Sequence, residues 1–545
     1  MTRNTLRIIP LGGLGEVGKN MMALEYDRDI IVIDAGVLFP GQDLPGVDLI
    51  IPDFSYLINN RNKIRGIFIT HGHEDHTGAL PYVLQKLQVP VYAPRLAKGL
   101  ISVKLREHKT LKNIVLEEAR PGKEIKAGQF RVEFFRVAHS IPDAMGLAIK
   151  TPLGKVIHTG DFKIDHTPVD GNPVSLTDLA RISQDGVFLL LSDSTYAELP
   201  GYTPSEQAIV ETLERIIGNA QGRVIIATFA SLISRVQLVI NAAFQHGRKV
   251  TTLGRSMVNN VKMAREMGYI TDPGNVLIDI EQFRHLKPEE MVILTTGSQG
   301  EPTSALVRIA KGEHRDVQIA TGDTIILSST PIPGNEIVVT KTIDNLFRQG
   351  AEVFYDKIAL VHVHGHASQE ELKMMINLTR PNFFVPVHGA HRHLIAHSRL
   401  AHNQGIPKEN IFVLEDGDVL ELSDKNGEVV DHVQSGHIYI KGKHTLDANS
   451  PILHDRQALS RDGMVAIMLA VDKNGHLIKR PIITSSGFMD TNDSVELLER
   501  TSETIFASIS KGNGSVIAQA KQSAKTFLYK ETGRRPIILL TTIEV

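Results

Sequence analysis

The chain has 545 residues, too many for one hydrophobic core, and at about 150 residues per domain it predicts three or four folded units. Its 59 lysines and arginines nearly balance its 61 aspartates and glutamates, which excludes a uniformly basic, histone-like protein. Because there is no cysteine, disulfides, thiolate zinc sites, iron–sulfur clusters and cysteine nucleophiles are excluded. The N-terminus lacks the layout of a signal peptide and no apolar run reaches about 18 residues, so we expect a cytoplasmic protein without a membrane segment.

The first two hundred residues alternate short apolar runs with turn residues, which is typical of a β-rich layered domain. A helical pattern at 80–87 interrupts the runs. Strands are predicted at 6–10, 30–34, 66–70, 130–137, 155–159 and 188–192.

From residue 203 the rhythm changes to strands that alternate with helices. The sequence TPSE at 203–206 is a capping box with proline at the first helical position, and it predicts that a helix begins there. A strand at 223–228, a helix at 234–245, a strand at 249–253 and a helix from 256 follow. This alternation indicates a parallel α/β unit, which ends near residue 355.

Strand-like segments rich in histidine return at 360–366 and 383–388, so the α/β unit is predicted to be inserted into the first domain. The stretch after residue 441 is poorly patterned and is predicted to be a linker. Beyond it, strands at 463–471 and 476–484, two helices and a strand at 537–543 indicate a small α+β module. The predicted boundaries are 1–203 and 357–441 for the first domain, 204–356 for the insertion, 442–455 for the linker and 456–545 for the module.

The most informative segment is HGHEDH at 71–76, which directly follows a predicted strand. Three imidazoles and a carboxylate this close together would repel one another if protonated, and burying them unpaired would cost free energy. Binding a divalent cation resolves both problems, because neutral histidine and ionised aspartate are metal ligands. A solvated polar loop is the alternative, but the H-x-H-x-D-H spacing favours metal.

Three further candidate ligands stand near predicted strand ends: His139, Asp161 and His388. Each taken alone is as well explained as a capping residue. Together with His71, His73, Asp75 and His76 they make seven nitrogen and oxygen ligands. Such a set suits two zinc-like ions about 3.5–4 Å apart that share one carboxylate.

These residues resemble the signature of the metallo-β-lactamase superfamily, with Asp34 as its first, structural aspartate. The resemblance implies an α/β fold in which an αββα sandwich carries the metals. It places His71, His73 and His139 on one metal, and Asp75, His76 and His388 on the other, with Asp161 bridging them. The inserted unit is similar to the α/β β-CASP domain of nucleases, whose motifs match SDST at 192–195, His366 and His388.

Further segments narrow the resemblance to the ribonuclease J family of bacteria, over essentially the whole chain. They are GGLGEVGKN at 12–20, TFAS at 228–231, GRSM at 254–257, TGSQGEP at 296–302, PIPGNE at 331–336 and GRRP at 533–536. One departure is His364, where a smaller residue is expected.

The resemblance implies a metal-dependent hydrolase with 5′→3′ exoribonuclease and endoribonuclease activity in RNA maturation, rRNA processing and mRNA decay. Its expected cofactors are two divalent ions, zinc first, with Mn²⁺ or Mg²⁺ as alternatives. The expected partners are single-stranded RNA with a 5′-monophosphate, further copies of the chain in a dimer or tetramer held by the C-terminal α+β domain, and other RNA-decay proteins.

Two metals lower the pKa of a shared water, and the hydroxide would attack the phosphodiester. Asp75, Asp193 and His366 are the candidate catalytic residues, with Asp193 orienting a neighbour and His366 contacting the phosphate or protonating the leaving group. A simple turn is the alternative for Asp193, and helix capping for the serines below. The candidate substrate-binding residues are Ser231, Ser234, His362, Val363, His364, Gly365 and His366.

The segment at 12–20 also nearly fits a phosphate-binding loop, but Asn20 stands where such a loop needs serine or threonine for Mg²⁺. A turn between strands at the rim of the metal site is the better interpretation. Arg235, Arg255 and Lys262 are candidates for an RNA channel, or else lie on solvated helix faces.

Three alternatives remain open at this point. A small-molecule hydrolase would keep the ligands but has no use for a long insertion. A non-catalytic scaffold is expected to lose ligands, whereas all seven are present. A DNA substrate is the hardest to exclude, and a substrate panel would decide it.

Overall fold

The computed structural model describes residues 4–41, 44–108, 114–332, 334–442, 444–447, 451–489, 491–509 and 515–545. The chain forms two compact units. One comprises residues 1–39 and 50–437, and the other comprises residues 40–49 and 438–545. In the described part of the chain, no helix combines the length and the apolar character needed to cross a lipid bilayer.

The first sheet of the larger unit has eight strands in the order β22-β21-β1-β3-β4-β6-β7-β8. The strands from β4 to β8 run parallel, and the others pair antiparallel. The strands are β1 (Leu6–Gly12), β3 (Met21–Tyr26), β4 (Asp29–Ile33), β6 (Ile64–Phe68), β7 (Val91–Ala93), β8 (Leu116–Glu118), β21 (Asp418–Leu422) and β22 (Gly427–His432).

The second sheet has six strands in the order β19-β13-β12-β11-β10-β9, of which β12, β13 and β19 run parallel. In β10, Phe130, Val132 and Phe134 alternate with more exposed residues, as expected for a strand with one buried face. The strands are β9 (Glu124–Ala127), β10 (Phe130–Arg136), β11 (Met145–Thr151), β12 (Gly154–His158), β13 (Val187–Asp193) and β19 (Pro381–Val387).

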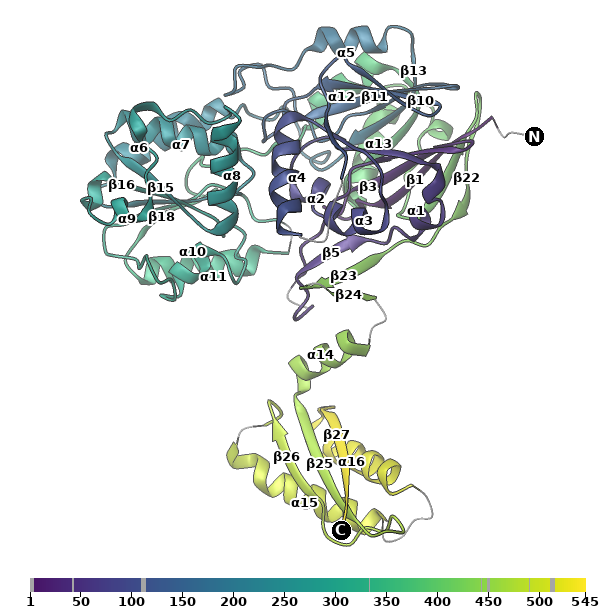
Figure 1. Cartoon of the computed structure of the whole chain (residues 1–545), viewed down its shortest axis with the longest axis vertical. Coiled ribbons are helices and arrows are strands. Elements are labelled where there is room, and N and C mark those ends of the chain that lie inside the picture. The colour runs from purple at the N-terminus through teal and green to yellow at the C-terminus, as the bar shows by residue number, and fades with distance from the viewer. Residues whose placement is uncertain are drawn as a thin grey trace. The chain divides into compact units, whose positions relative to one another are not determined.

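The two sheets pack face to face around one core, to which Leu6, Ile31 and Phe68 contribute from the first sheet and Val132 and Leu189 from the second. Helices α5, α12 and α13 cover the outer face of the second sheet, and α4 packs against β7 and β8 (Figure 1). The predicted αββα sandwich is thereby confirmed. Its helices are α1 (Ser55–Asn59), α2 (Glu74–Thr77), α3 (Leu80–Lys86), α4 (Arg95–Glu107), α5 (Leu176–Ser183), α12 (Gln369–Thr379) and α13 (His391–Asn403), and its short strands are β2 (Leu14–Gly15), β5 (Leu49–Pro52) and β20 (Gly389–Ala390).

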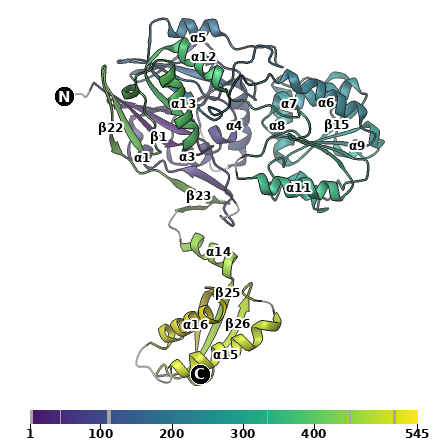
Figure 2. The ribbon, with the colours of Figure 1, turned by 180° about the vertical axis from the view of Figure 1, so that it is seen from behind.

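The inserted unit is a five-stranded parallel sheet in the order β15-β16-β14-β17-β18. Helices α6, α7 and α8 pack on one face, and α10 and α11 on the other (Figure 2). This confirms the predicted α/β insertion. The elements are β14 (Val224–Ala227), β15 (Lys249–Leu253), β16 (Met291–Thr295), β17 (Thr324–Leu327), β18 (Glu352–Phe354), α6 (Gln207–Asn219), α7 (Ile233–Gln245), α8 (Arg255–Glu266), α9 (Ile280–Phe283), α10 (Ala305–Ala310) and α11 (Glu336–Arg348).

The helix expected to begin at the capping box of residues 203–206 begins at Gln207 instead, and that prediction was wrong. The two capping side chains have other partners. Thr203 Oγ1 donates to the carbonyl of His366 at 2.8 Å, and the Glu206 carboxylate pairs with Arg235 at 2.7 Å. Tertiary contacts therefore outweigh the local capping signal.

The predicted strand at 360–366 is also wrong, because this segment is an extended loop outside any sheet. Its carbonyls bond to side chains instead of to a neighbouring strand: Val361 O accepts from Ser328 Oγ, and Gly365 O from His139 Nδ1.

In the smaller unit, β25 lies between β26 and β27, with α15 and α16 packed on one face around a separate apolar core. The strand predicted at 476–484 is displaced to β26, and only Leu477 of its first part bridges to β25. The predicted linker at 442–455 contains β24 and the beginning of α14. The elements are β23 (His437–Lys441), β24 (His444–Asp447), α14 (Pro451–Asp462), β25 (Met464–Val471), β26 (Ile482–Ser486), α15 (Thr491–Ile509), α16 (Val516–Thr532) and β27 (Ile537–Glu544).

Candidate metal centre

Three neighbouring parallel strands of the second sheet end at the same edge, and a polar residue lies at or just beyond each end. Asp161 follows β12, Asp193 is the last residue of β13, and His388 directly follows β19. The shared strand direction therefore brings Asp161 and His388 into contact although they are 227 residues apart in the sequence.

The histidine-rich segment at 71–76 follows β6 of the facing sheet. His71 and His73 precede α2, whereas Asp75 and His76 lie in its only turn. The structure brings all seven predicted ligands together in two groups. Within each group, the ligand atoms all lie within 4.8 Å of one another. The groups are His71, His73, His139 and Asp161, and Asp75, His76, Asp161 and His388. A third group, Asp161, Asp193, His366 and His388, overlaps the second and contains two residues outside the predicted ligand set.

In the first group, two imidazoles approach one carboxylate oxygen and the third lies against them. His71 Nε2 lies 3.6 Å and His139 Nε2 3.8 Å from Asp161 Oδ2, and His73 Nδ1 lies 3.0 Å from His71 Nε2. Burial is the largest cause that lowers the pKa of His73 to about 4, and it holds the pKa of His71 and of His139 well below the ordinary value. The imidazoles are therefore neutral, which is the form that binds a cation.

In the second group, Asp161 contacts two further histidines. Its Oδ2 lies 3.1 Å from His76 Nε2, and its Oδ1 accepts from His388 Nδ1 at 2.8 Å. Asp75 Oδ2 lies 3.5 Å from His76 Nε2 and from His388 Nε2. Burial alone would raise the pKa of Asp161, but the imidazoles of His388 and His76 outweigh it and hold this pKa well below its usual range.

One nitrogen of the cluster supports the presence of a cation site. His388 Nε2 is buried and has no hydrogen-bond partner among the described residues. Such a nitrogen costs free energy unless something accepts its lone pair. Since the surrounding donors are nitrogen and oxygen atoms without a thiolate, the cluster fits a divalent metal site.

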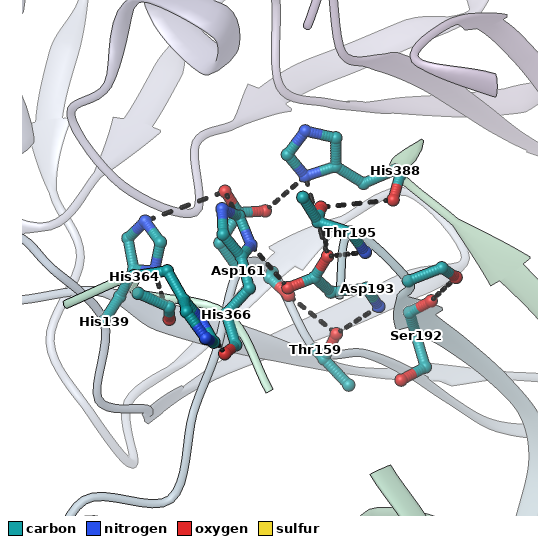
Figure 3. A network of polar contacts seen from close by, with 12 residues as sticks. His139, Thr159, Asp161, Ser192, Asp193, Thr195, His364, His366 and His388 are labelled. Atoms are coloured by element: carbon teal, nitrogen blue, oxygen red, sulfur yellow. Dashed lines mark hydrogen bonds and ion pairs between the residues drawn. The ribbon is translucent and has the colours of Figure 1, made fainter. Parts of the chain in front are cut away.

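His366 adjoins this cluster and is held by Asp193, as Figure 3 shows. His366 Nδ1 donates to Asp193 Oδ2 at 2.8 Å, and its ring lies edge-on to that of His139 at 4.9 Å. Asp193 is itself fixed by Thr195, whose backbone N–H and hydroxyl donate to Oδ1. Burial would lower the pKa of His366, but the carboxylates of Asp193 and Asp161 raise it to about 9.

Family models match successive parts of the chain. The metallo-β-lactamase superfamily matches residues 14–201, the ribonuclease J β-CASP domain 221–346, the RNA specificity domain of Zn-dependent metallo-hydrolases 354–414, and the ribonuclease J C-terminal domain 451–545. Ribonuclease J of Synechocystis sp. is 44% identical over 99% of this chain and 87% of its own length. The chain belongs to the ribonuclease J family. It is a metal-dependent ribonuclease with a divalent metal site.

Other members of the ribonuclease J family agree. Ribonuclease J2 of Bacillus subtilis is 41% identical over 99% of each chain, and ribonuclease J 1 of Streptococcus pyogenes is 41% identical over 98% of this chain and 97% of its own length. A solved protein of unknown function from Enterococcus faecalis aligns with a TM-score of 0.53 at 16% identity. It covers 77% of this chain and is itself wholly covered, and it supports the fold alone.

The loop at 362–366 of this ribonuclease J homologue combines contact residues with core residues. Gly365 O accepts from His139 Nδ1 at 2.7 Å, and a Cβ on Gly365 would lie 2.5 Å from that nitrogen, which explains the glycine. Val363 is a buried core side chain, so only its backbone is available to a substrate. The buried Nδ1 atom of the half-buried His362 has no hydrogen-bond partner among the described residues.

His364, where a smaller residue was expected, stacks on Tyr196 with 3.9 Å between ring centroids and 11° between planes. Its Nδ1 donates to the carbonyl of His366 at 2.9 Å. Burial is the largest cause that lowers the pKa of His364 to about 4, so its imidazole is neutral. Tyr196 carried no sequence signal, because the stack joins residues from two distant segments.

The two serines of the ribonuclease have different surroundings. Ser234 lines a partly open pocket together with His139 and Arg136, whereas Ser231 lies half-buried in the turn before α7. Arg235, a candidate for an RNA channel or a solvated helix face, is buried and fits neither alternative. It is 1% exposed, pairs with Glu206 and donates to Val361 O at 2.8 Å, while Arg255 and Lys262 are exposed.

One residue that the sequence interpretation missed is Glu371, whose fully buried carboxylate accepts three backbone N–H groups at 2.8 Å each. They belong to Ile164, Thr203 and Ser368. The carboxylate therefore ties together the segments after Asp161, before the insertion and after His366. The capping-box spacing from Ser368 to Glu371 was the available signal, and both capping contacts are present in the structure.

Proposed function

We propose that this ribonuclease removes nucleotides from the 5′ end of monophosphorylated RNA and also cuts RNA internally, in rRNA maturation and mRNA decay. Its cluster would hold two divalent cations, zinc first. His71, His73 and His139 would hold one, Asp75, His76 and His388 the other, and Asp161 both. The observation that carries this proposal is that two four-residue ligand groups overlap in Asp161 alone.

When bound, two divalent cations would lower the pKa of a water molecule toward neutrality and offset negative charge on the scissile phosphate. The protein would supply the proton for the leaving oxygen. Against the effect of burial, Asp193 and Asp161 raise the pKa of His366 and so favour its protonated form, and Asp193 keeps its Nδ1 occupied. Its Nε2 proton is therefore the one available for transfer.

The proposed 5′-end pocket combines Ser231, Ser234 and the loop at 362–366. Its support is that Ser234 and His139 line one cavity, while His139 also bonds to Gly365 of the loop. Hydroxyl and backbone N–H groups are suitable donors to a phosphate. Each acidic residue that lines this pocket has a cationic neighbour, which lessens its repulsion of a phosphate. Arg136 lies 3.8 Å from both Asp143 and Asp170, Lys163 lies 3.4 Å from Asp165, and Arg235 pairs with Glu206.

The test uses one RNA that carries either a 5′-monophosphate or a 5′-triphosphate, together with a DNA of the same sequence, with and without a chelator. Mononucleotide release from the monophosphorylated RNA alone, lost on chelation, is the expected result. Internal cuts that ignore the 5′ end would replace the proposal with an endonuclease. Equal cleavage of the DNA would overturn the RNA preference.

We also propose that the C-terminal α+β domain mediates formation of a homodimer or homotetramer. The support is the uncovered face of its sheet, where Met468, Ile482 and Leu539 are 43%, 70% and 51% exposed. Removing residues 451–545 and measuring the mass in solution tests this, and an unchanged mass would contradict it. The cytoplasmic location and the contacts with other RNA-decay proteins stay predictions.

A further inference from the structure

The loop at 12–20, which resembles a phosphate-binding loop in sequence, ends in a residue that contacts the metal cluster from outside. Asn20 is 8% exposed, and its backbone N–H donates to the carbonyl of Asp75 at 3.0 Å. Its side-chain Nδ2 donates to the same carbonyl at 3.1 Å and lies 3.2 Å from His76 Nε2 and 3.5 Å from Asp75 Oδ2. One amide thus contacts two candidate ligands.

The conformation of the loop separates its last two side chains. Gly18 and Lys19 both have positive φ angles, of 115° and 58°, so the chain turns sharply before Asn20. The Lys19 ammonium, 1% exposed, lies 2.8 Å from Glu16 Oε1 and 3.3 Å from Asp416 Oδ2. The buried ion cluster anchors the loop without using any residue of the metal centre.

The contact of His76 with Asp34 indicates which of its two ring nitrogens carries the proton in the neutral imidazole. His76 Nδ1 lies 2.8 Å from Asp34 Oδ2, and a carboxylate requires the proton on that nitrogen. In the neutral form that binds a cation, His76 Nε2 therefore carries a lone pair beside Asp75, Asp161 and the Asn20 amide. The amide donates to the Asp75 carbonyl and lies 3.2 Å from this nitrogen, so it contacts Asp75 and His76 together.

The loop also has no room for the role that its sequence suggests. A Cβ on Gly12 would lie 2.1 Å from the carbonyl of Lys19, so the loop folds back on itself instead of opening around a phosphate. The segment after it is β3, a buried strand, and not the helix whose N-terminus would bind a phosphate. The side chain of its last residue, Asn20, contacts Asp75 and His76 of the metal centre instead.

We propose that Asn20 is a positioning residue for the cation held by Asp75, His76, Asp161 and His388, and not for the cation held by His71, His73 and His139. Its amide fixes Asp75 through the backbone carbonyl, an atom that binds no cation, and so holds the Asp75 carboxylate beside His76 before the cation arrives. This rests on the two-cation centre proposed above. The glycine-rich loop is then a support of the metal centre.

The experiment titrates the full-length, metal-free protein with Zn²⁺ in competition with a chromophoric chelator. The wild type is expected to bind two ions. Asn20→Leu approximately keeps the side-chain volume but removes the amide. It is expected to lower the affinity for one of the two zinc ions by about 10–100-fold, as for other residues that hydrogen-bond to metal ligands. Asn410→Ala is the matched control, because Asn410 Nδ2 likewise donates to one backbone carbonyl, that of Asn382.

Two backgrounds identify which ion is affected. With His388→Ala, which removes a ligand of the second group only, Asn20→Leu should cause no further loss. With His139→Ala, which removes a ligand of the first group only, it should keep its full effect. The role of Asn20 would be overturned by the opposite pattern, by an equal loss of affinity for both ions, or by unchanged affinity. A wild type that binds fewer than two ions would instead overturn the two-cation centre.

A structural effect is distinguished by thermal unfolding of the metal-free proteins. Asn20→Leu should unfold within a few degrees of Asn410→Ala while differing from it in zinc affinity. If Asn20→Leu proves unstable, Asn20→Ser is measured in its place. Its shorter hydroxyl cannot reach both Asp75 and His76, so the same selective loss is expected, and its absence would contradict the proposal.

Discussion

The two ligand groups of the metal cluster share Asp161 but differ in what lies behind their imidazoles. In the first group the outward nitrogens contact neutral oxygens: His71 Nδ1 lies 3.1 Å from Thr70 Oγ1, and His139 Nδ1 donates to Gly365 O. These acceptors fix the ring directions but add no charge. Burial therefore dominates, and the pKa of both histidines lies well below its ordinary value.

In the second group a carboxylate takes the same position behind one imidazole. His76 Nδ1 lies 2.8 Å from Asp34 Oδ2. Burial again lowers the pKa of His76, but Asp161, Asp75 and Asp34 outweigh it and raise this pKa well above its ordinary value. A carboxylate behind an imidazole makes the imidazole a stronger ligand. The second group should therefore hold its cation more tightly than the first.

The largest effect is expected from removing a ligand of the tighter group. His76→Ala should reduce RNA cleavage by about 10³-fold or more, because preorganised charge at the phosphate is lost. A chelator should do the same to the wild type, and added Zn²⁺ or Mn²⁺ should reverse it. Initial rates on 5′-monophosphorylated RNA measure the effect. His432→Ala, an exposed histidine paired with Asp418, is the control, and a His76→Ala enzyme as active as this control would refute the metal centre.

The next prediction tests whether a charged group behind an imidazole strengthens metal binding more than a neutral one. Asp34→Asn keeps the shape of the side chain but removes the charge behind His76, so the affinity for one zinc ion should fall by about 10–100-fold. Thr70→Val removes the neutral hydroxyl behind His71, which also donates to Asp34 Oδ2 at 2.9 Å. It leaves the charge of Asp34 in place and should therefore have a clearly smaller effect. Competition with a chromophoric chelator measures both. Equal losses would show that the charge behind the imidazole does not matter here.

Strand ends explain why the ligands were predictable from the sequence. HGHEDH follows a clear strand, and Asp161 and His388 also follow clear strands, so local patterns found all three. Contacts between distant side chains have no such pattern. Glu371 meets Thr203 across 168 residues, and Tyr196 stacks on His364, and neither contact leaves a periodicity in the sequence.

The wrong element boundaries have a related physical reason. Local propensity predicted a helix from residue 204 and a strand at 360–366, where tertiary contacts decide otherwise. The Thr203 hydroxyl and the Glu206 carboxylate, which would have capped the helix, bond to His366 and Arg235 instead. These errors gather at the junction that carries the proposed substrate loop. Residues there are constrained by their site more than by their own segment.

A smaller effect is expected from changing Glu371, whose carboxylate holds together the segments near Asp161 and His366. Glu371→Gln turns one acceptor oxygen into a donor that faces backbone N–H groups, which should cost about 1–3 kcal/mol of unfolding free energy. The midpoint of thermal unfolding should fall by several degrees. Glu370→Gln is the matched control, because Glu370 forms only a surface pair with Lys373. Identical midpoints for the two variants would contradict the role of Glu371.

The smallest effect concerns His397, a buried imidazole of the same domain that contacts neither a carboxylate nor the cluster. Its Nδ1 lies 3.0 Å from Ser194 Oγ, and burial lowers its pKa to about 3. The unfolded chain binds this proton below about pH 6.5, and the folded protein does not. The stabilisation is therefore present above pH 6.5 and is lost as the pH falls.

Between pH 7 and 5.5 the wild type should lose about 1 kcal/mol more unfolding free energy than His397→Phe, since a single proton separates them. Denaturant unfolding of both proteins in the presence of a chelator measures the difference, in which the titration of all other groups cancels. If the two pH dependences are parallel, burial beside a neutral hydroxyl does not keep an imidazole neutral in this fold. The contrast between the two ligand groups would then have to come from the metal alone.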